Sequence, residues 1–347
     1  MSDSKTLVWE QRWHPLREEW VLFTSHRGAR PWLGEKNRPA AEVVPAFDPT
    51  CALCPGNKRV QGSNPFYTGA YVFTNDLPCF SDAAPDTESA ALGDLYLRRP
   101  ARGTAEVICY SPDHSKTFAL LTEAEALAVS RLWRERHIEL GARPEVDHVL
   151  IFENKGSEVG TSNPHPHCQI YAGNLIYGIT ARHVQASKRH FERTGRFLGQ
   201  DILAREMGSP RIIAQNESFL ACVPWFARYA YEVYVLSKRP CASLAGLDEA
   251  ELAHFAALLR EVAIRYDNLW RQPMPYIMAI HQAPTDGGDY RAFPFHVEFH
   301  PPLRRPDTMK FLAGPEIGGG SMTNESDPDE KAAELRRASA IHYTESE

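Results

Sequence analysis

The chain has 347 residues, which at about 150 residues per domain predicts two structural units. Its hydrophobic fraction of 43% and charged fraction of 24% are typical of a globular protein, and no run approaches the ~20 apolar residues of a membrane span. The net charge of −6 argues against a nucleic-acid-binding surface. Residues 1–6 resemble no secretory or organelle signal. We therefore expect a cytoplasmic protein with neither a membrane nor a nucleic-acid partner.

The first chemical signature along the chain is the pair Cys51 and Cys54. Cys-x-x-Cys is a spacing that zinc favours, and in a cytosolic chain with 7 cysteines it indicates metal or redox chemistry rather than a disulfide framework. Two thiolates do not complete a tetrahedral zinc site, so histidines should supply the other ligands, with His114 and His165 as the natural candidates. A redox pair and a coincidental spacing stay open as alternatives.

A strand, a helix and a second strand are predicted next. Residues 106–110 and 149–152 are rich in β-branched and aromatic side chains, as strands are. Between them, Thr122 and Glu125 form a helix-start signature, because the threonine oxygen can cap an unpaired N–H and the glutamate can reach back. We therefore expect a helix over residues 120–140 that lays an apolar stripe on a sheet.

The strongest local signal follows in residues 163–171. If this segment is a strand, His165, His167 and Gln169 share one face while Cys168 and Ile170 point into the core. A metal could then use both imidazoles, or one histidine could bind a metal while the other stays free as a nucleophile. A surface or structural role for the histidines is the remaining alternative.

The second part of the chain repeats the first. A shift of 126 positions lays residues 120–140 on residues 246–266, and the repeated helix again has a start signature, from Asp248 to Glu251. Strands are predicted at 232–236 and 276–280, and a second histidine cluster begins at His296. The sequence thus predicts a duplicated α+β chain with halves at 1–180 and 181–347, each with a mostly antiparallel sheet. A chance match of one amphipathic helix is the alternative.

The end of the chain holds a Gly-rich stretch, residues 318–321, which predicts a flexible connection. A last helix is predicted at residues 330–338.

Five motifs, in order over nearly the whole chain, together resemble the galactose-1-phosphate uridylyltransferase family. They are Cys51–Asn57, Tyr71–Asp76, Ser111–Lys116, Phe152–Gly156 and Ser162–Gln169. The resemblance implies a duplicated histidine-triad-like fold, with an antiparallel half-barrel sheet and flanking helices, and a homodimer. It agrees with the repeat found above.

The resemblance also implies a reaction. His167 would be the nucleophile that attacks the α-phosphorus of UDP-glucose, releases glucose 1-phosphate and holds the uridylyl group until galactose 1-phosphate takes it. Gln169 would donate to the phosphoryl oxygens as charge develops there. A related nucleotidyltransferase or phosphorylase with another sugar nucleotide or acceptor is the nearest alternative, and a zinc-stabilised binding module without catalysis is another.

Two metal sites are implied by the same resemblance. A structural Zn²⁺ would be held by Cys51, Cys54, His114 and His165. The family has a second site of three histidines and a glutamate, whose positions here correspond to His183, His281, His296 and Glu298, with histidine and glutamate exchanged between the first and the last. This set can still bind Zn²⁺ or Fe²⁺. The alternative is that His183 is an exposed helix residue and Glu298 a salt-bridge partner.

Substrate-binding residues follow from the family motifs as well. Those implied for the nucleotide and its phosphates are Arg27, Arg30, Asn75, Asp76, Asn154, Gly160, Thr161, Ser162 and Gln169. Those implied for the hexose phosphate are Lys310, Phe311, Pro315 and Glu316. Proline stands where the family has a tyrosine, and this removes a phenol and a backbone N–H from the acceptor site.

Overall fold

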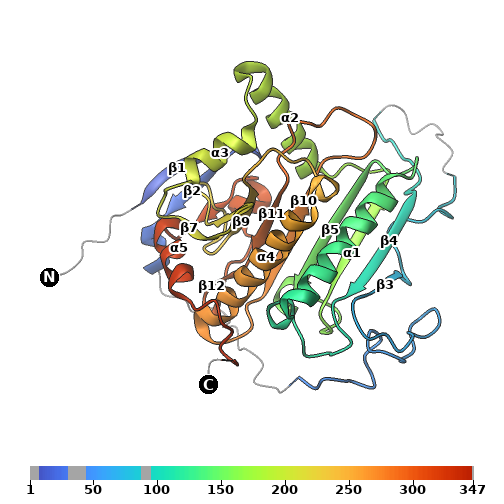
Figure 1. The fold of residues 1–347 in the computed structure, drawn as a ribbon. Coiled ribbons are helices and arrows are strands. Elements are labelled where there is room, and N and C mark those ends of the chain that lie inside the picture. The colour runs from blue at the N-terminus through green and yellow to red at the C-terminus, as the bar shows by residue number, and fades with distance from the viewer. Residues whose placement is uncertain (1–7, 30–43, 87–94, 346–347) are drawn as a thin grey trace.

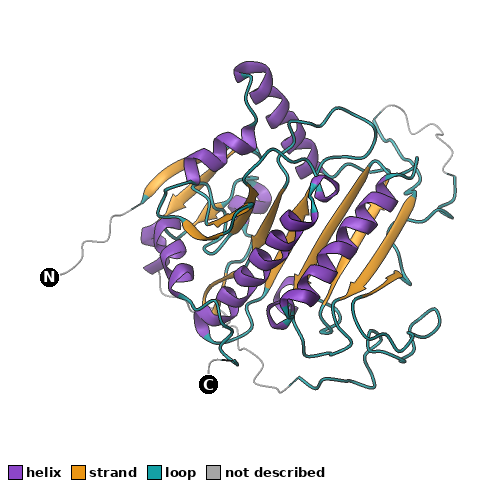
Figure 2. Ribbon diagram, in the orientation of Figure 1, coloured by secondary structure: helices purple, strands orange, loops and turns teal. Residues whose placement is uncertain are grey.

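A computed structural model describes residues 8–29, 44–86 and 95–345 of the chain. Nine strands form one open sheet in which every neighbouring pair is antiparallel (Figures 1 and 2). In spatial order they are β3 (Tyr71–Thr74), β4 (Gly103–Cys109), β6 (His167–Gly173), β5 (His148–Lys155), β10 (Tyr276–His281), β11 (His296–His300), β9 (Val233–Ser237), β8 (Phe219–Cys222) and β7 (Ile212–Gln215). The predicted α+β class with an antiparallel sheet and flanking helices is confirmed.

Two long helices lie side by side over one face of this sheet (Figure 1). They are α1 (Glu123–Gly141) and α4 (Glu249–Trp270), and both start with the predicted capping box, formed by Thr122 with Glu125 and by Asp248 with Glu251. Each begins three residues later than predicted, because a short 3-10 turn precedes it, at Phe118–Leu120 and at Leu244–Gly246.

Three further helices complete the helical part: α2 (Gly178–Thr194), α3 (Leu198–Glu206) and α5 (Pro328–Arg337). The last one corresponds to the helix predicted at 330–338 and packs against β7 and α4. Short turns occur at Ser25–Ala29, Ser157–Val159 and Gly314–Gly318. Within the described ranges, no helix has the length and apolar character needed to cross a bilayer.

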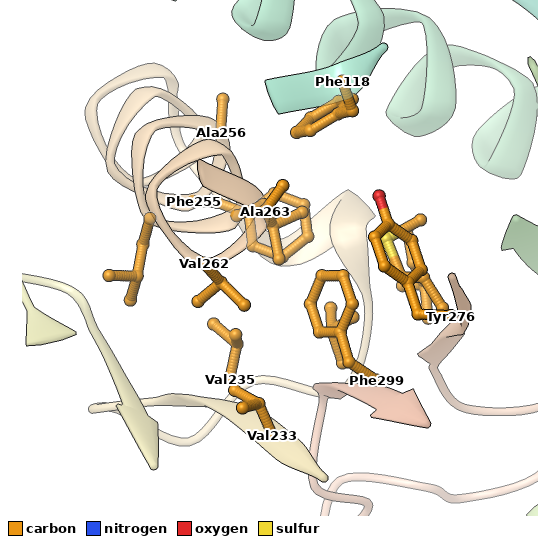
Figure 3. Close-up of a cluster of buried hydrophobic side chains, with 14 of the residues drawn as sticks. Phe118, Val233, Val235, Phe255, Ala256, Val262, Ala263, Tyr276 and Phe299 are labelled. Carbon is orange, nitrogen blue, oxygen red and sulfur yellow. The ribbon is translucent and has the colours of Figure 1, made fainter. Parts of the chain in front are cut away.

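The core lies between the sheet and the two long helices and is shared by both halves of the chain. Figure 3 shows Val233 and Val235 of β9 beneath Val262 of α4, with Phe299 of β11 beside them. Residues of the first half, including Phe118, belong to the same continuous cluster. The halves meet where β5 pairs with β10, so backbone hydrogen bonds join them at the centre of the sheet. The boundary at residue 180 stays a prediction.

A smaller sheet ties the N-terminal segment to the C-terminal one. It contains the hairpin β1 (Trp9–His14) and β2 (Glu19–Thr24), and β14 (Thr323–Asn324) pairs with β2 in parallel. A two-stranded ribbon, β12 (Leu303–Arg305) and β13 (Thr308–Met309), precedes β14. The flexible connection predicted at 318–321 therefore leads directly into a paired strand, and the hairpin packs on the C-terminal half.

Candidate active site

His167 is the first residue of β6 and pairs with Cys109 of β4. Its Nδ1 lies 2.7 Å from the backbone carbonyl oxygen of His165. Because a carbonyl can only accept, Nδ1 carries the proton and Nε2 keeps its lone pair. Burial lowers the pKa of His167, so the imidazole is neutral near pH 7. The side chain thus has the protonation state of a nucleophile.

Gln169 shares the face of His167, while Cys168 and Ile170 lie in the core with no exposed surface, as predicted. The Tyr171 hydroxyl donates to the Gln169 amide oxygen at 3.4 Å. With the oxygen engaged, the amide NH₂ group is the part that can donate to a ligand. His165 is an exception to the predicted strand, because β6 begins only at His167 and His165 belongs to the preceding loop.

The four residues predicted for zinc come together beside this strand. Ligand atoms of Cys51, Cys54, His114 and His165 all lie within 4.8 Å of one another, and all four side chains are buried. Cys54 Sγ is 3.5 Å from Nδ1 of His114 and 3.5 Å from Nδ1 of His165.

The protonation states around Cys54 suit a cation. His165 Nε2 lies 2.9 Å from the Ser111 carbonyl oxygen and therefore carries the proton, so Nδ1 has a lone pair toward Cys54. Burial lowers the pKa of His165 to about 4, which keeps it neutral. Burial, with Cys51 nearby, raises the pKa of Cys54 to about 11. A thiolate forms here at neutral pH only with a cation present, and Cys₂His₂ is a donor set of Zn²⁺.

The second cluster joins three elements. His183 comes from α2, His281 from the end of β10, and His296 and Glu298 from β11. All four are buried and their ligand atoms lie within 4.8 Å of one another. His183 has no exposed surface, so the alternative that it is an exposed helix residue is wrong.

Unsatisfied nitrogen atoms mark this second cluster. Neither ring nitrogen of His183 or of His281 makes a hydrogen bond, although both side chains are buried. His296 Nδ1 lies 2.7 Å from the Pro294 carbonyl oxygen, which leaves Nε2 to face Glu298 Oε1 at 3.1 Å. Buried polar atoms are nearly always satisfied, so these orphaned nitrogens fit a divalent ion held by three imidazoles and one carboxylate.

Glu298 is also an ion-pair partner, as the alternative interpretation held, but the sequence did not reveal with which residue. The Arg17 Nη2 lies 2.5 Å from Glu298 Oε2, and the two residues are 281 positions apart in the chain. His300 and Arg228 approach the same oxygen at 3.1 and 3.6 Å. Burial alone would raise the pKa of Glu298, but Arg17 and His281 hold it well below its usual value. No local motif signals a contact across so long a separation.

The residues expected to bind the nucleoside lie near the ends of β3 and β5, which are separated in the sheet by β4 and β6. Asn75 and Asp76 follow β3, and Asn154 lies near the end of β5. The Thr161 hydroxyl donates to the Asn154 carbonyl oxygen at 2.5 Å. Gly160 has φ +82°, a conformation that favours glycine, and this turns the chain before Ser162 and the nucleophile loop.

The other phosphate and sugar residues lie in a different part of the molecule. Lys310 Nζ is 2.8 Å from Glu316 Oε1 and donates to the Thr323 carbonyl oxygen at 2.6 Å, next to β14. Arg27 is 3.5 Å from Glu325, also beside β14, and Arg30 lies outside the described residues. Figure 1 shows β2, which pairs with β14, on the opposite side of the molecule from β4, which pairs with β6. The contacts therefore do not bring Lys310 or Arg27 to His167.

Pro315 and Phe311 belong to that same segment. Pro315 lies in the turn Gly314–Gly318, where the missing N–H is tolerated in the first helical turn, and Phe311 is half exposed.

A neutral imidazole with a fixed tautomer, an amide donor on the same face and a buried Cys₂His₂ cluster are the features expected of a group-transfer enzyme with a histidine nucleophile. The chain belongs, more narrowly, to the galactose-1-phosphate uridylyltransferase family. The family model for "galactose-1-phosphate uridyl transferase, N-terminal domain" matches residues 2–176, and that for the C-terminal domain matches residues 183–347.

Individual relatives agree with this assignment. A galactose-1-phosphate uridylyltransferase of Haemophilus influenzae is 38% identical over 338 residues, which cover 96% of each chain. A solved structure of a uridylyltransferase superposes with a TM-score of 0.76 at 27% identity, covering 96% of this chain and 98% of that one. An ADP-glucose phosphorylase from Arabidopsis thaliana has a TM-score of 0.75 at 21% identity, covering 95% and 98%, and shares the fold.

Proposed function

We propose that the protein transfers a uridylyl group from UDP-glucose to galactose 1-phosphate by a ping-pong mechanism through a covalent uridylyl-histidine at His167. The observation that carries this proposal is the 2.7 Å contact between His167 Nδ1 and the His165 carbonyl oxygen. It fixes the tautomer with Nε2 unprotonated, which the first step requires.

Two displacements make up the reaction. The Nε2 lone pair attacks the α-phosphorus, an N–P bond forms, and the bond to the bridging oxygen breaks, so that glucose 1-phosphate leaves with both electrons. The Nδ1–H stays hydrogen-bonded to the His165 carbonyl, which stabilises the positive charge on the uridylylated ring. A phosphate oxygen of galactose 1-phosphate then attacks the same phosphorus, the N–P bond breaks, and UDP-galactose forms. Gln169 donates to the non-bridging oxygens in both steps.

The metal assignments belong to this proposal. Zn²⁺ at Cys51, Cys54, His114 and His165 has a structural role, because four protein ligands leave no open position for substrate. His183, His281, His296 and Glu298 would hold a second ion, Zn²⁺ or Fe²⁺. When bound, each ion cross-links elements that are distant in sequence.

A homodimer in the cytoplasm is part of the same proposal. Strand β1 is an edge strand, and Trp9 and Trp20 of its hairpin are 79% and 51% exposed, as interface residues often are. The cytoplasm keeps thiols reduced, which the two cysteine ligands require. Sedimentation of the purified protein measures the dimer directly.

The test follows the phosphorus atom. With UDP-glucose labelled in its α-phosphate, the wild-type protein should take up one label per chain and pass it to galactose 1-phosphate. His167→Ala should lose both steps by at least about 10³-fold while keeping its fold, because it lacks the attacking atom. His190→Ala, at a partly buried histidine of α2 that pairs with Asp201, is the matched control. Undiminished turnover of His167→Ala would exclude the mechanism, and transfer to inorganic phosphate instead of galactose 1-phosphate would identify a phosphorylase.

A further inference from the structure

Arg17 lies in the turn between β1 and β2, far in sequence from the second cluster, yet its side chain is only 4% exposed and ends on Glu298. Its backbone N–H donates to His14 Nδ1 at 3.2 Å, and His14 in turn lies 3.1 Å from the Tyr234 hydroxyl on β9. The turn is therefore anchored against the main sheet, and the guanidinium has a fixed approach to Glu298.

The two oxygens of Glu298 have different surroundings. Oε2 lies 2.5 Å from Arg17 Nη2 and 3.1 Å from His300 Nε2. His281 Nε2 and Arg228 Nη2 are farther from it, at 3.5 and 3.6 Å. Oε1 faces His296 at 3.1 Å and His183 at 3.9 Å. Oε2 thus faces the guanidinium groups of Arg17 and Arg228, with His281 on the same side, whereas Oε1 faces only the imidazoles of His296 and His183 among the described ion pairs of Glu298.

We propose that Arg17 is a positioning residue for the second metal centre: it holds Oε2 and so presents Oε1 to the ion as a single oxygen ligand. This inference rests on the metal site proposed above. A carboxylate without such a partner can offer both oxygens and rotate between them. With Oε2 held, the ligand set is three nitrogens and one oxygen, which is the four-coordinate set that Zn²⁺ favours. Groups that orient metal ligands in this way typically contribute 10- to 100-fold in metal affinity.

In a competing interpretation, Arg17 weakens metal binding at the second cluster instead of strengthening it. The guanidinium could itself serve as the countercharge of Glu298, in which case a metal ion would have to compete with it. The unsatisfied nitrogens favour positioning, because the described ion pair of Arg17 is with Glu298, and a cluster completed by Arg17 would still leave the ring nitrogens of His183 and His281 without a hydrogen bond.

The experiment measures Zn²⁺ binding to the whole chain. After chelation, Zn²⁺ is titrated back against a competing chelator, and metal content is checked by mass spectrometry. Arg17→Met should bind the second equivalent 10- to 100-fold more weakly than wild type, Arg17→Lys by an intermediate factor, and the first equivalent should be unchanged in both. Arg12→Met is the matched control, since Arg12 is a buried arginine of the same hairpin that contacts Glu10 and Trp225 instead of Glu298. Retention of the first Zn²⁺ and an unchanged circular dichroism spectrum report that each variant folds.

The effect of Arg17→Met on Zn²⁺ affinity should have the opposite sign when Glu298 is also replaced. In Glu298→His the guanidinium loses its carboxylate and becomes an unpaired buried cation beside the ion, so adding Arg17→Met should now strengthen Zn²⁺ binding. Stronger or unchanged binding of Arg17→Met in the wild-type background overturns the positioning role while leaving the metal site in place. A wild-type chain that takes up only the first equivalent overturns the metal site and the inference together.

Discussion

At the scale of single residues, Glu153 is a carboxyl group inside an apolar core. It lies on β5 with only 3% of its surface exposed to water, and the Tyr276 hydroxyl donates to its Oε2 at 3.2 Å. Burial raises the pKa of Glu153 to about 7, although Lys155 opposes the shift. The folded protein therefore binds this proton more tightly than the unfolded chain does.

That proton makes stability depend on pH. Because the folded pKa is about 7 and the ordinary value is 4.5, the contribution of Glu153 is fully present below about pH 4.5 and is lost as the pH rises through 7. Glu153→Gln is neutral at every pH, so the free energy of unfolding of this variant should rise relative to wild type by about 3 kcal/mol between pH 4.5 and 8. Urea unfolding at several pH values measures the difference. The exposed Glu135→Gln should show no such trend, and a constant offset for Glu153→Gln would contradict a raised pKa.

At the scale of elements, the two long helices depend on the same start signal. In α4 the Asp248 carboxylate accepts from the Glu251 N–H at 2.8 Å, and the Glu251 side chain accepts from the Asp248 N–H at 3.0 Å. Both bonds satisfy N–H groups that a helix leaves unpaired at its first turn.

Asp248→Ala should therefore destabilise the protein by about 1 kcal/mol, with no effect on metal content. Asp289→Ala, in an exposed loop and paired only with Arg291 among the described ion pairs, serves as the comparison. Equal unfolding free energies for the two variants in denaturant titrations would show that the cap contributes nothing measurable.

Prediction from sequence succeeded where the signal is local. Capping boxes located α1 and α4. The alternation of side chains between the two faces of a strand placed His167 and Gln169 on the face opposite Cys168. The β1–β2 hairpin was not predicted to join the C-terminal half, because its partner β14 lies about 300 residues later and no local pattern encodes that pairing. The contact of Arg17 with Glu298 was missed for the same reason. Burial of His183 could not be read from its helix, since the covering groups come from β10 and β11.

At the scale of the whole molecule, an ion in the Cys₂His₂ cluster would fasten the segment before β3 to the sheet. Cys51 and Cys54 precede β3, His114 follows β4, and His165 precedes β6, so one ion would join three segments. When the free concentration of an ion is about 100 to 1,000 times its Kd, binding of the ion stabilises the folded state by roughly 3 to 4 kcal/mol.

Cys51→Ser should consequently lose zinc and melt at a lower temperature, by about 4 °C for about 3 kcal/mol in a chain of 347 residues with one shared core. Metal analysis and thermal melting are made on the same samples. Cys79→Ser, at an exposed cysteine outside the cluster, should change neither quantity. If Cys51→Ser retains its zinc and its Tm, the ligands lie elsewhere.

The two carbonyl contacts described above, of His167 with His165 and of His296 with Pro294, are both 2.7 Å long and stand at the start of equivalent strands. The same oriented imidazole thus occurs at the start of one strand in each half of the chain, and the residue two positions later differs. After His167 this residue is an uncharged amide, Gln169, whereas after His296 it is a carboxylate, Glu298, whose Oε1 lies 3.1 Å from the imidazole Nε2. A change of charge at one position therefore separates the surroundings of two imidazoles that the backbone orients in the same way.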